Sequence, residues 1–217
     1  DLVRIITLLR DPVNGCPWDK VQTHTSIRMN FLEEAYEAVD ALDLDDPVLM
    51  CEELGDVLMQ VAFHTCMEQE TGRFTWEQVC DGVCQKLIER HPNIFGTKPG
   101  YEGITDWDAL KNKEKGRRTL ADDLESVPRA MPALMRAAKL QKRAARHGAA
   151  LQGADAAALA DAAENLQTAQ PASAQAEQAA GELLFAAANL ARQAGVDPEQ
   201  ALQKANEAFS TAAGPVA

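Results

Sequence analysis

The stretch LMCEELGDVLMQVAFH, residues 49–64, is the most informative part of the sequence for fold and function, because three carboxylates interrupt a segment that is otherwise almost entirely apolar. At 3.6 residues per turn, Glu53 and Asp56 fall between apolar neighbours, and Glu52 lies next to Glu53. A helix that is apolar nearly all round is expected to be buried, and buried acids need partners. The stretch therefore predicts a buried helix whose carboxylates are neutralised by a bound cation or by a distant Lys or Arg.

A second pair of acids precedes this stretch in NFLEEAYEAVD, residues 30–40. Glu34 and Glu37 are three residues apart, as are Glu53 and Asp56, so each pair shares one face of its helix. The turn sequence LDDP separates the two segments and favours antiparallel neighbours. Taken alone, the first pair is more typical of a solvated acidic face. Together with the second helix, it predicts four carboxylates that converge between two helices.

The donor types indicate which metal such a site would take. An all-oxygen set without histidine favours a hard cation, Mg²⁺ or Mn²⁺. A di-iron bundle would need Glu-x-x-His on its helices, and His64 stands eleven residues after Glu53. Because Mg²⁺ takes its remaining ligands from water and substrate phosphates, the pattern predicts chemistry on a phosphate ester or anhydride.

Charge and cysteine content narrow the class of protein further. The formal net charge of −12 argues against a nucleic-acid polymer as the main ligand. Residues 29–72 contain 12 acids and no Lys or Arg, as expected of a segment that holds a cation. No apolar run approaches 18 residues, so no membrane span is expected. The five cysteines lack the spacing of a zinc site, which favours reduced thiols in a cytoplasm.

Helix signals dominate the chain, and the alternating β-branched runs typical of strands are nearly absent. Thr25 or Ser26, Asp46 and Thr75 are expected N-caps, and Pro92 is expected to end the third helix. These signals predict an all-α protein with helices near residues 26–42, 48–70, 76–90, 107–115, 133–146, 156–168, 172–193 and 199–211.

An internal repeat relates the two halves of the chain. EELGDVLMQVAFH, residues 52–64, matches QAAGELLFAAANL, residues 178–190, and both keep the glycine and the acid after it. Ala179, however, stands where the first copy has Glu53. The upstream acids also correspond, in the pairs Glu34 with Asp161 and Glu37 with Glu164. Alanine makes up 24 of the residues 154–217, so the second copy should be helical but weakly packed.

Two cationic side chains are candidates for binding phosphate. Lys86 and Arg90 lie four residues apart on one helical face, and a guanidinium can hold phosphate oxygens bidentately. An exposed basic tip with Glu89 nearby is an equally common reading of this spacing. The second copy has Ala208 and Ala212 at these places, so cations and carboxylates are lost together. Coupled loss favours a shared ligand site.

GCPWDKVQTH, residues 15–24, is the other stretch dense in functional residue types. Trp18 is read either as a stacking surface for a nucleobase or as a hydrophobic plug under a loop, the commoner role of a lone tryptophan. Lys20 is a further candidate substrate contact. Gly55, unfavourable inside a helix by about 1 kcal/mol relative to Ala, is expected to allow close helix approach beside the metal.

Four motifs in this order, LLRDPVNGCPWDKVQTH, NFLEEAYEAVDAL, EELGDVLMQVAFH and KLIERHPNIFG, resemble the MazG nucleoside triphosphate pyrophosphohydrolases. The later PALMRAAKLQKRAARHG and ALQKANEAF resemble the start and end of that family's second repeat. The resemblance implies tandem helical units with a four-helix core completed by dimerisation. It also implies hydrolysis of nucleoside triphosphates to monophosphate and pyrophosphate. The implied metal ligands are Glu34, Glu37, Glu53 and Asp56, and the implied phosphate contacts are Lys86 and Arg90.

The resulting hypothesis is a catalytic unit over residues 1–100, a linker with a short helix over 101–132, and a degenerate second unit over 133–217. Mg²⁺ would bridge the carboxylates and the triphosphate, and a bound water would attack the α-phosphorus. Glu33 or Glu52 would orient or deprotonate that water. The expected assembly is a homodimer, and the expected role is housecleaning of the nucleotide pool.

Two alternatives stay open at this point. One is a non-catalytic helical regulator that binds a nucleotide or a protein, favoured by the loss of chemistry in the second copy. The other is a pyrophosphatase narrow for one nucleotide, such as dUTP or phosphoribosyl-ATP. The complete set of acids in the first copy favours an enzyme over a regulator, and the base and sugar preference is left open.

Overall fold

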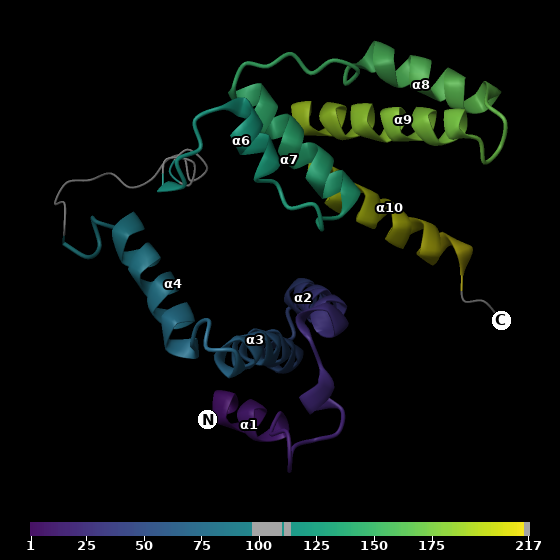
Figure 1. The fold of residues 1–217 in the computed structure, drawn as a ribbon. Coiled ribbons are helices and arrows are strands. Elements are labelled where there is room, and N and C mark those ends of the chain that lie inside the picture. Colours follow the sequence, from purple (N-terminus) through teal and green to yellow (C-terminus); the bar gives the residue numbers. More distant parts are fainter. Residues whose placement is uncertain (97–109, 111–113, 215–217) are drawn as a thin grey trace. The chain divides into compact units, whose positions relative to one another are not determined.

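The computed structural model describes residues 1–96, 110 and 114–214, and the chain divides into two compact units, residues 1–104 and 105–217. All regular elements in the described residues are helices, which confirms the all-α class (Figure 1). None of these helices is long and apolar enough to cross a membrane. The short helix expected near residues 107–115 lies almost wholly outside the described residues. The finer division at residues 100 and 132 stays a prediction.

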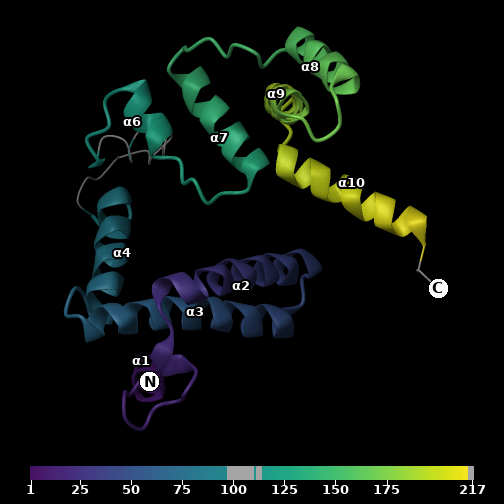
Figure 2. The same cartoon turned by 45° about the vertical axis from the view of Figure 1, so that its right-hand side comes forward.

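The first unit is built on an antiparallel helix pair. It contains α1 (Leu2–Leu9), the 3₁₀ turn η1 (Asp19–Val21), α2 (His24–Leu44), α3 (Pro47–Glu70) and α4 (Trp76–Arg90). α2 and α3 lie side by side along most of their lengths (Figure 2). The chain reverses between them at Asp45, whose left-handed φ of 54° ends α2. The pair predicted from the two acidic segments is therefore present.

Side-chain caps decide where these helices begin. Asp46 caps α3 by accepting hydrogen bonds from the backbone N–H groups of Val48 and Leu49, as predicted. Thr75 caps α4, also as predicted, and forms a capping box with Gln78. The prediction for α2 was wrong by two or three residues, because the cap is Thr23. Thr23 is the residue that has a partner three positions later, in the hydroxyl of Ser26.

The core of the first unit lies on the C-terminal half of α3. The buried cluster there consists of Ile6, Ile27, Ala62, Phe63, Cys66 and Met67. Ile6 comes from α1, an eight-residue helix that the sequence reading missed. α1 has no side-chain cap, so only its apolar stripe marks it.

The N-terminal half of α3 is not buried within one chain. Val48, Leu54 and Leu58 keep 76%, 50% and 49% of their surface exposed. The prediction of a helix buried all round is therefore wrong for the single chain, because α2 covers only one side of this half. The proposed role of Gly55 is contradicted as well, since a Cβ there would meet nothing within 4 Å.

The second unit repeats the helix-pair theme with alanine-rich helices. It contains α6 (Leu120–Glu125), α7 (Ala133–Arg146), α8 (Ala156–Thr168), α9 (Ala174–Gln193) and α10 (Pro198–Ala213). α8 and α9 form the main contact, and α7 packs on α9 (Figure 1). α6 was not predicted. It is held on α7 by Asp123, which is 1% exposed and pairs with Arg143 at 3.0 Å and Arg146 at 3.2 Å.

Candidate metal and phosphate site

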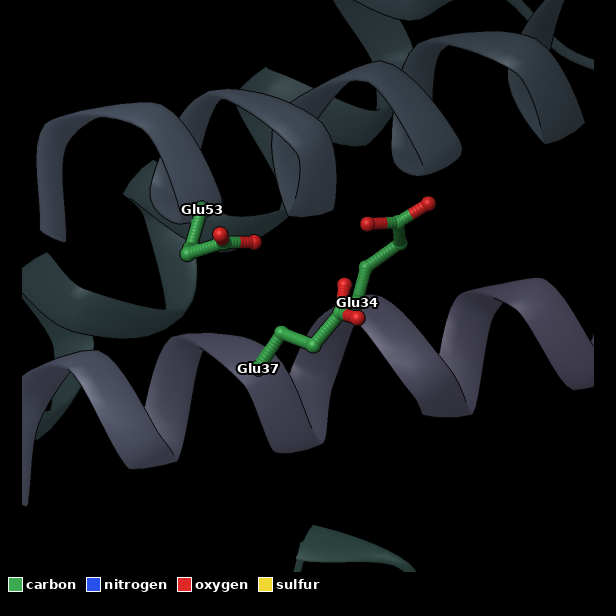
Figure 3. A group of neighbouring side chains, drawn as sticks. All are labelled: Glu34, Glu37 and Glu53. Atoms are coloured by element: carbon green, nitrogen blue, oxygen red, sulfur yellow. The ribbon is translucent and has the colours of Figure 1, made fainter. Parts of the chain in front are cut away.

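Three carboxylates converge between α2 and α3. Glu34, Glu37 and Glu53 each offer an oxygen, and these oxygens lie within 4.8 Å of one another (Figure 3). Two of the three residues come from one face of α2, and the third projects toward them from α3. The three-residue spacing on α2 and the antiparallel register of the pair are what bring them together. In the described residues this is the one group of at least three metal-ligating side chains.

Asp56 lies one turn after Glu53 on α3 and is half-buried. It is outside the group of three, yet its charge acts on two members of that group. Glu33 and Glu52, the two candidates for orienting a water, are exposed neighbours of Glu34 and Glu53 in the chain. The structure thus brings three of the four predicted metal ligands together and places the fourth beside them.

The negative charges of the clustered carboxylates repel one another. Desolvation, followed by the charge of Asp56, raises the pKa of Glu53. Desolvation also raises the pKa of Glu34, and Asp56 and Glu37 add to it, while a hydrogen bond from Gln60 lowers it. Among the described ion pairs, none joins these acids to a basic side chain. A group of acids without a counter-charge is what a cation stabilises.

The residues fit a hard divalent cation. All the converging donors are carboxylate oxygens, the ligand type that Mg²⁺ and Mn²⁺ prefer. Gln60, on α3, is 7% exposed and donates through Nε2 to Glu34 Oε1 at 3.3 Å. Its Oε1 atom is buried without a hydrogen-bond partner. The sequence reading assigned Gln60 no role.

Lys86 and Arg90 do not reach this cluster within one chain. α4 is anchored to the core at its first residue, Trp76, and Figure 2 shows it running away from the α2–α3 pair. Arg90, at the last residue of α4, is 14 residues beyond that anchor, which is about 21 Å along the helix axis. The structure therefore keeps the predicted cations on one helix but not beside the carboxylates of the same chain.

The loop that carries Trp18 and Lys20 lies near the C-terminal end of α3, far from the carboxylate cluster. Arg10, 8% exposed, binds Glu70 through two hydrogen bonds of 2.6 and 2.8 Å and the carbonyl oxygen of Asp19 at 2.8 Å. Glu70 is 17 residues from Glu53, which is about 25 Å along α3. Trp18 keeps 57% of its surface exposed, so the reading as a buried plug is wrong. The structure does not bring this tryptophan or Lys20 to the cluster of the same chain.

The second unit has an open cleft at the equivalent place between α8 and α9. It has a volume of about 760 Å³, and Asp161 and Glu182 line it, the counterparts of Glu34 and Asp56. Ala179, at the position of Glu53, is buried. No group of three metal-ligating side chains forms in the described part of this unit.

Comparison with known proteins places these residues in a wider context. Residues 22–95 match the family model described as the MazG nucleotide pyrophosphohydrolase domain. That segment contains all four predicted metal ligands together with Lys86 and Arg90, and it excludes Trp18 and Lys20.

Several relatives match over most of the chain. The chain is 41% identical over 217 residues to the nucleoside triphosphate pyrophosphohydrolase of Escherichia coli strain K12, covering 96% of this chain and 82% of that protein. It is 39% identical over 211 residues to the nucleoside triphosphate pyrophosphohydrolase/pyrophosphatase MazG of Thermotoga maritima, covering 96% and 81%. A nucleoside triphosphate pyrophosphohydrolase of Mycobacterium tuberculosis is 35% identical over 151 residues, covering 68% and 46%.

Proposed function

This chain belongs to the MazG nucleotide pyrophosphohydrolase family, and from that premise we propose that it hydrolyses nucleoside triphosphates between the α- and β-phosphates. The products are a nucleoside monophosphate and pyrophosphate. The observation that carries the proposal is the cluster of Glu34, Glu37 and Glu53, whose oxygens lie within 4.8 Å of one another without a basic partner in the described residues. Carboxylate oxygens gathered in this way are the ligands by which proteins hold Mg²⁺ at substrate phosphates.

The carboxylates bind the divalent cation. Bound Mg²⁺, or Mn²⁺ in its place, supplies charge stabilisation at the phosphoryl oxygens and lowers the pKa of a bound water. Glu34 and Glu37 hold the cation from α2 and Glu53 from α3, and Asp56 completes the set. Their ligand atoms, all carboxylate oxygens, favour a hard cation over zinc, because no histidine or cysteine joins them in the described residues.

Two exposed acids are the candidate groups for the attacking water. Glu33 and Glu52 stand next to metal ligands on α2 and α3, so either can accept a hydrogen bond from a water beside the cluster. The general base takes one proton from the water as its oxygen attacks the α-phosphorus. The identity of the base between these two stays open.

Lys86 and Arg90 neutralise the leaving pyrophosphate, and a second copy of the chain brings them to the carboxylates. This homodimer accounts for two features of the first unit: α4 runs away from the cluster of its own chain, and the half of α3 around Glu53 is uncovered. The exposed apolar side chains that such a dimer would bury are Tyr36, Val39 and Leu42 on α2, Leu54 and Leu58 on α3, and Val83 and Leu87 on α4. Trp18, exposed on its loop, is then available to stack on a base, with Lys20 beside it.

The second unit has a structural role rather than a catalytic one. Ala179 replaces a metal ligand, and Ala208 and Ala212 replace the two cations. The cleft that remains between α8 and α9 keeps Asp161 and Glu182 but forms no three-carboxylate group in the described residues. We place the enzyme in a cytoplasm, where its five free thiols would stay reduced, and assign it to nucleotide housecleaning.

Product analysis tests the function directly. The purified chain is incubated with Mg²⁺ and a panel of ribo- and deoxyribonucleoside triphosphates, including dUTP, and the products are separated. Monophosphate and pyrophosphate, both lost in Glu53→Gln, are the expected result. Diphosphate and phosphate would contradict the bond assignment. Nucleotide binding without turnover across the panel would favour the regulator, and turnover of a single nucleotide would favour the narrow pyrophosphatase.

A further inference from the structure

In the described residues of the first unit, Gln60 is the buried side chain that has a polar atom without a hydrogen-bond partner. It lies one turn after Asp56 on α3 and is 7% exposed. An amide can donate two hydrogen bonds and accept two, and buried polar atoms in folded proteins rarely go without a partner. In this structure the amide of Gln60 makes one bond, from Nε2 to Glu34, and its Oε1 atom has no partner.

The orientation of this amide follows from its partner. An ionised carboxylate only accepts hydrogen bonds, so the nitrogen of Gln60 must face Glu34 and the oxygen must be the atom left over. Both atoms are bonded to one planar carbon and lie about 2.2 Å apart, and the oxygen is inaccessible to solvent. A buried acceptor in that place costs free energy unless something donates to it.

We propose that Gln60 is a positioning residue of the metal site: its N–H fixes the carboxylate of Glu34 toward the cation, and this orientation is kept although it leaves Oε1 buried without a donor. The proposal rests on the proposed metal-dependent function and deepens it. Groups that orient metal ligands in this way commonly change metal affinity by about 10–100-fold when they are removed.

The second copy of the helical unit supports this assignment. Ala186 occupies the position of Gln60 there and is fully buried. Ala179 likewise occupies the position of Glu53. The glutamine and the metal ligand are thus both replaced by alanine in the second copy. A glutamine that serves the bound cation would lose its use when that ligand is lost.

The chain also offers a matched control in Gln141. This glutamine on α7 is 1% exposed, donates one bond from Nε2 to the carbonyl oxygen of Phe185 at 2.7 Å, and likewise has an Oε1 without a partner. It lies in the second unit, on a helix that carries no candidate ligand. Substituting either residue removes a buried amide of the same kind, so only an effect specific to the metal site should separate them.

The experiment measures Mn²⁺ binding to the metal-free chain of both units, residues 1–217, by calorimetry and without nucleotide. Gln60→Met is nearly volume-neutral and removes both polar atoms, and Gln141→Met does the same in the second unit. We expect affinity to fall about tenfold or more in Gln60→Met and to stay unchanged in Gln141→Met. Turnover of Gln60→Met should recover partly when Mg²⁺ is raised, because mass action refills a weakened site.

Three outcomes would count against the proposal in different ways. Equal Mn²⁺ affinity in the wild type and Gln60→Met would overturn the role of Gln60 and leave the proposed function intact. Equal losses in both glutamine variants would mean a general effect of removing a buried amide, which also overturns it. No Mn²⁺ binding by the wild type would overturn the metal site itself, and with it the metal-dependent function.

A second measurement covers the case in which Gln60→Met does not fold. In the wild type, Mg²⁺ is titrated while the side-chain amide resonances of Gln60 and Gln141 are followed by NMR. A shift of the Gln60 resonances alone, saturating with the metal, is the expected result. Unchanged Gln60 resonances at saturating Mg²⁺ would overturn the proposal.

Discussion

Glu34 of α2 and Glu53 of α3 face each other across the helix pair, each with a carboxylate oxygen within 4.8 Å of the other. Because no basic side chain pairs with them in the described ion pairs, the metal-free cluster is a source of repulsion. A cation that binds only the folded chain should raise its melting temperature. At a Mg²⁺ concentration of about 100 times Kd the expected rise is roughly 5–10 °C. Thermal melts with Mg²⁺ and with EDTA measure it, and unchanged melts at saturating Mg²⁺ would contradict a preformed site.

The same repulsion predicts a pH dependence of the metal-free chain. The pKa values of Glu34 and Glu53 are raised in the fold, so the folded chain holds these protons more tightly than the unfolded chain does. Stability from these groups therefore falls as the pH rises through the raised values, and stays low above them. Glu34→Gln removes one of the groups. In EDTA, its melting temperature relative to wild type should increase from about pH 4 to pH 7.

Other carboxyls titrate in the opposite sense, which is why the comparison must be a difference between two chains. Hydrogen bonds to backbone N–H groups lower the pKa of Asp11, and hydrogen bonds from Thr119 and Arg118 lower the pKa of Asp122. Their contribution is the same in wild type and in Glu34→Gln, so it cancels. A difference in melting temperature that does not change with pH would reject the proposed repulsion.

Catalysis should depend on the first copy and not on the second. Glu53→Gln or Asp56→Asn should lower kcat by about 100-fold or more, because each removes a charge that holds the cation. Glu182→Gln is the matched control, since Glu182 is the counterpart of Asp56 and lines the cleft of the second unit. Its steady-state kinetics should equal those of the wild type. A severe loss in Glu182→Gln would move catalysis to the second unit.

The parts of the fold set by local signals were predictable. An aspartate followed by proline marks the start of α3, and Thr75 with Gln78 marks the start of α4. The three-residue spacing of Glu34 and Glu37, and of Glu53 and Asp56, predicted that each pair shares one face of its helix, because i and i+3 positions on a helix are neighbours whatever else surrounds them. The short helices α1 and α6 were missed, because eight- and six-residue helices depend on tertiary contacts more than on propensity.

The rest of the candidate site depends on packing between distant segments, which residue spacing does not encode. The sequence shows that Lys86 and Arg90 share a helical face, but the direction in which α4 leaves the core is set by the contacts of Trp76. The role proposed for Gln60 depends on its burial, and a helical-wheel projection of α3 does not show that α2 covers this residue. The exposure of Leu54 depends on whether a second chain is present.

Arg10 should contribute to stability far more than its place at the end of α1 indicates. Its guanidinium donates hydrogen bonds to the carboxylate of Glu70 and to the carbonyl oxygen of Asp19. It also lies over the ring of Phe63, with Cζ 5.3 Å from the ring centroid. Because Glu70 is half-exposed, we expect Arg10→Met to cost about 2 kcal/mol of unfolding free energy. Arg4→Met, at an exposed position on the same helix, should change it by less than about 0.5 kcal/mol. Urea unfolding of the two variants measures both losses of unfolding free energy. Equal losses would contradict a special contribution of the Arg10 contacts.

The strongest test of the homodimer is complementation between two inactive chains. Glu53→Gln lacks a metal ligand but keeps both cations, and the double variant Lys86→Met with Arg90→Met keeps the carboxylates. If the cations of one chain serve the carboxylates of the other, a mixed dimer contains one intact site and one site with both defects. Half of the dimers in an equal mixture are mixed, so activity should return to about a quarter of the wild-type value.

The same mixture distinguishes the alternative arrangement. If α4 of each chain moved to the cluster of its own chain, both sites of a mixed dimer would be defective and the mixture would stay inactive. The subunits must exchange before the assay, which mild urea followed by dialysis achieves, and a mixture of Glu53→Gln with Asp56→Asn serves as the control. These two changes fall in the same half of the site, so that mixture should show no recovery under either arrangement. Recovery in the first mixture alone therefore identifies a site shared between two chains.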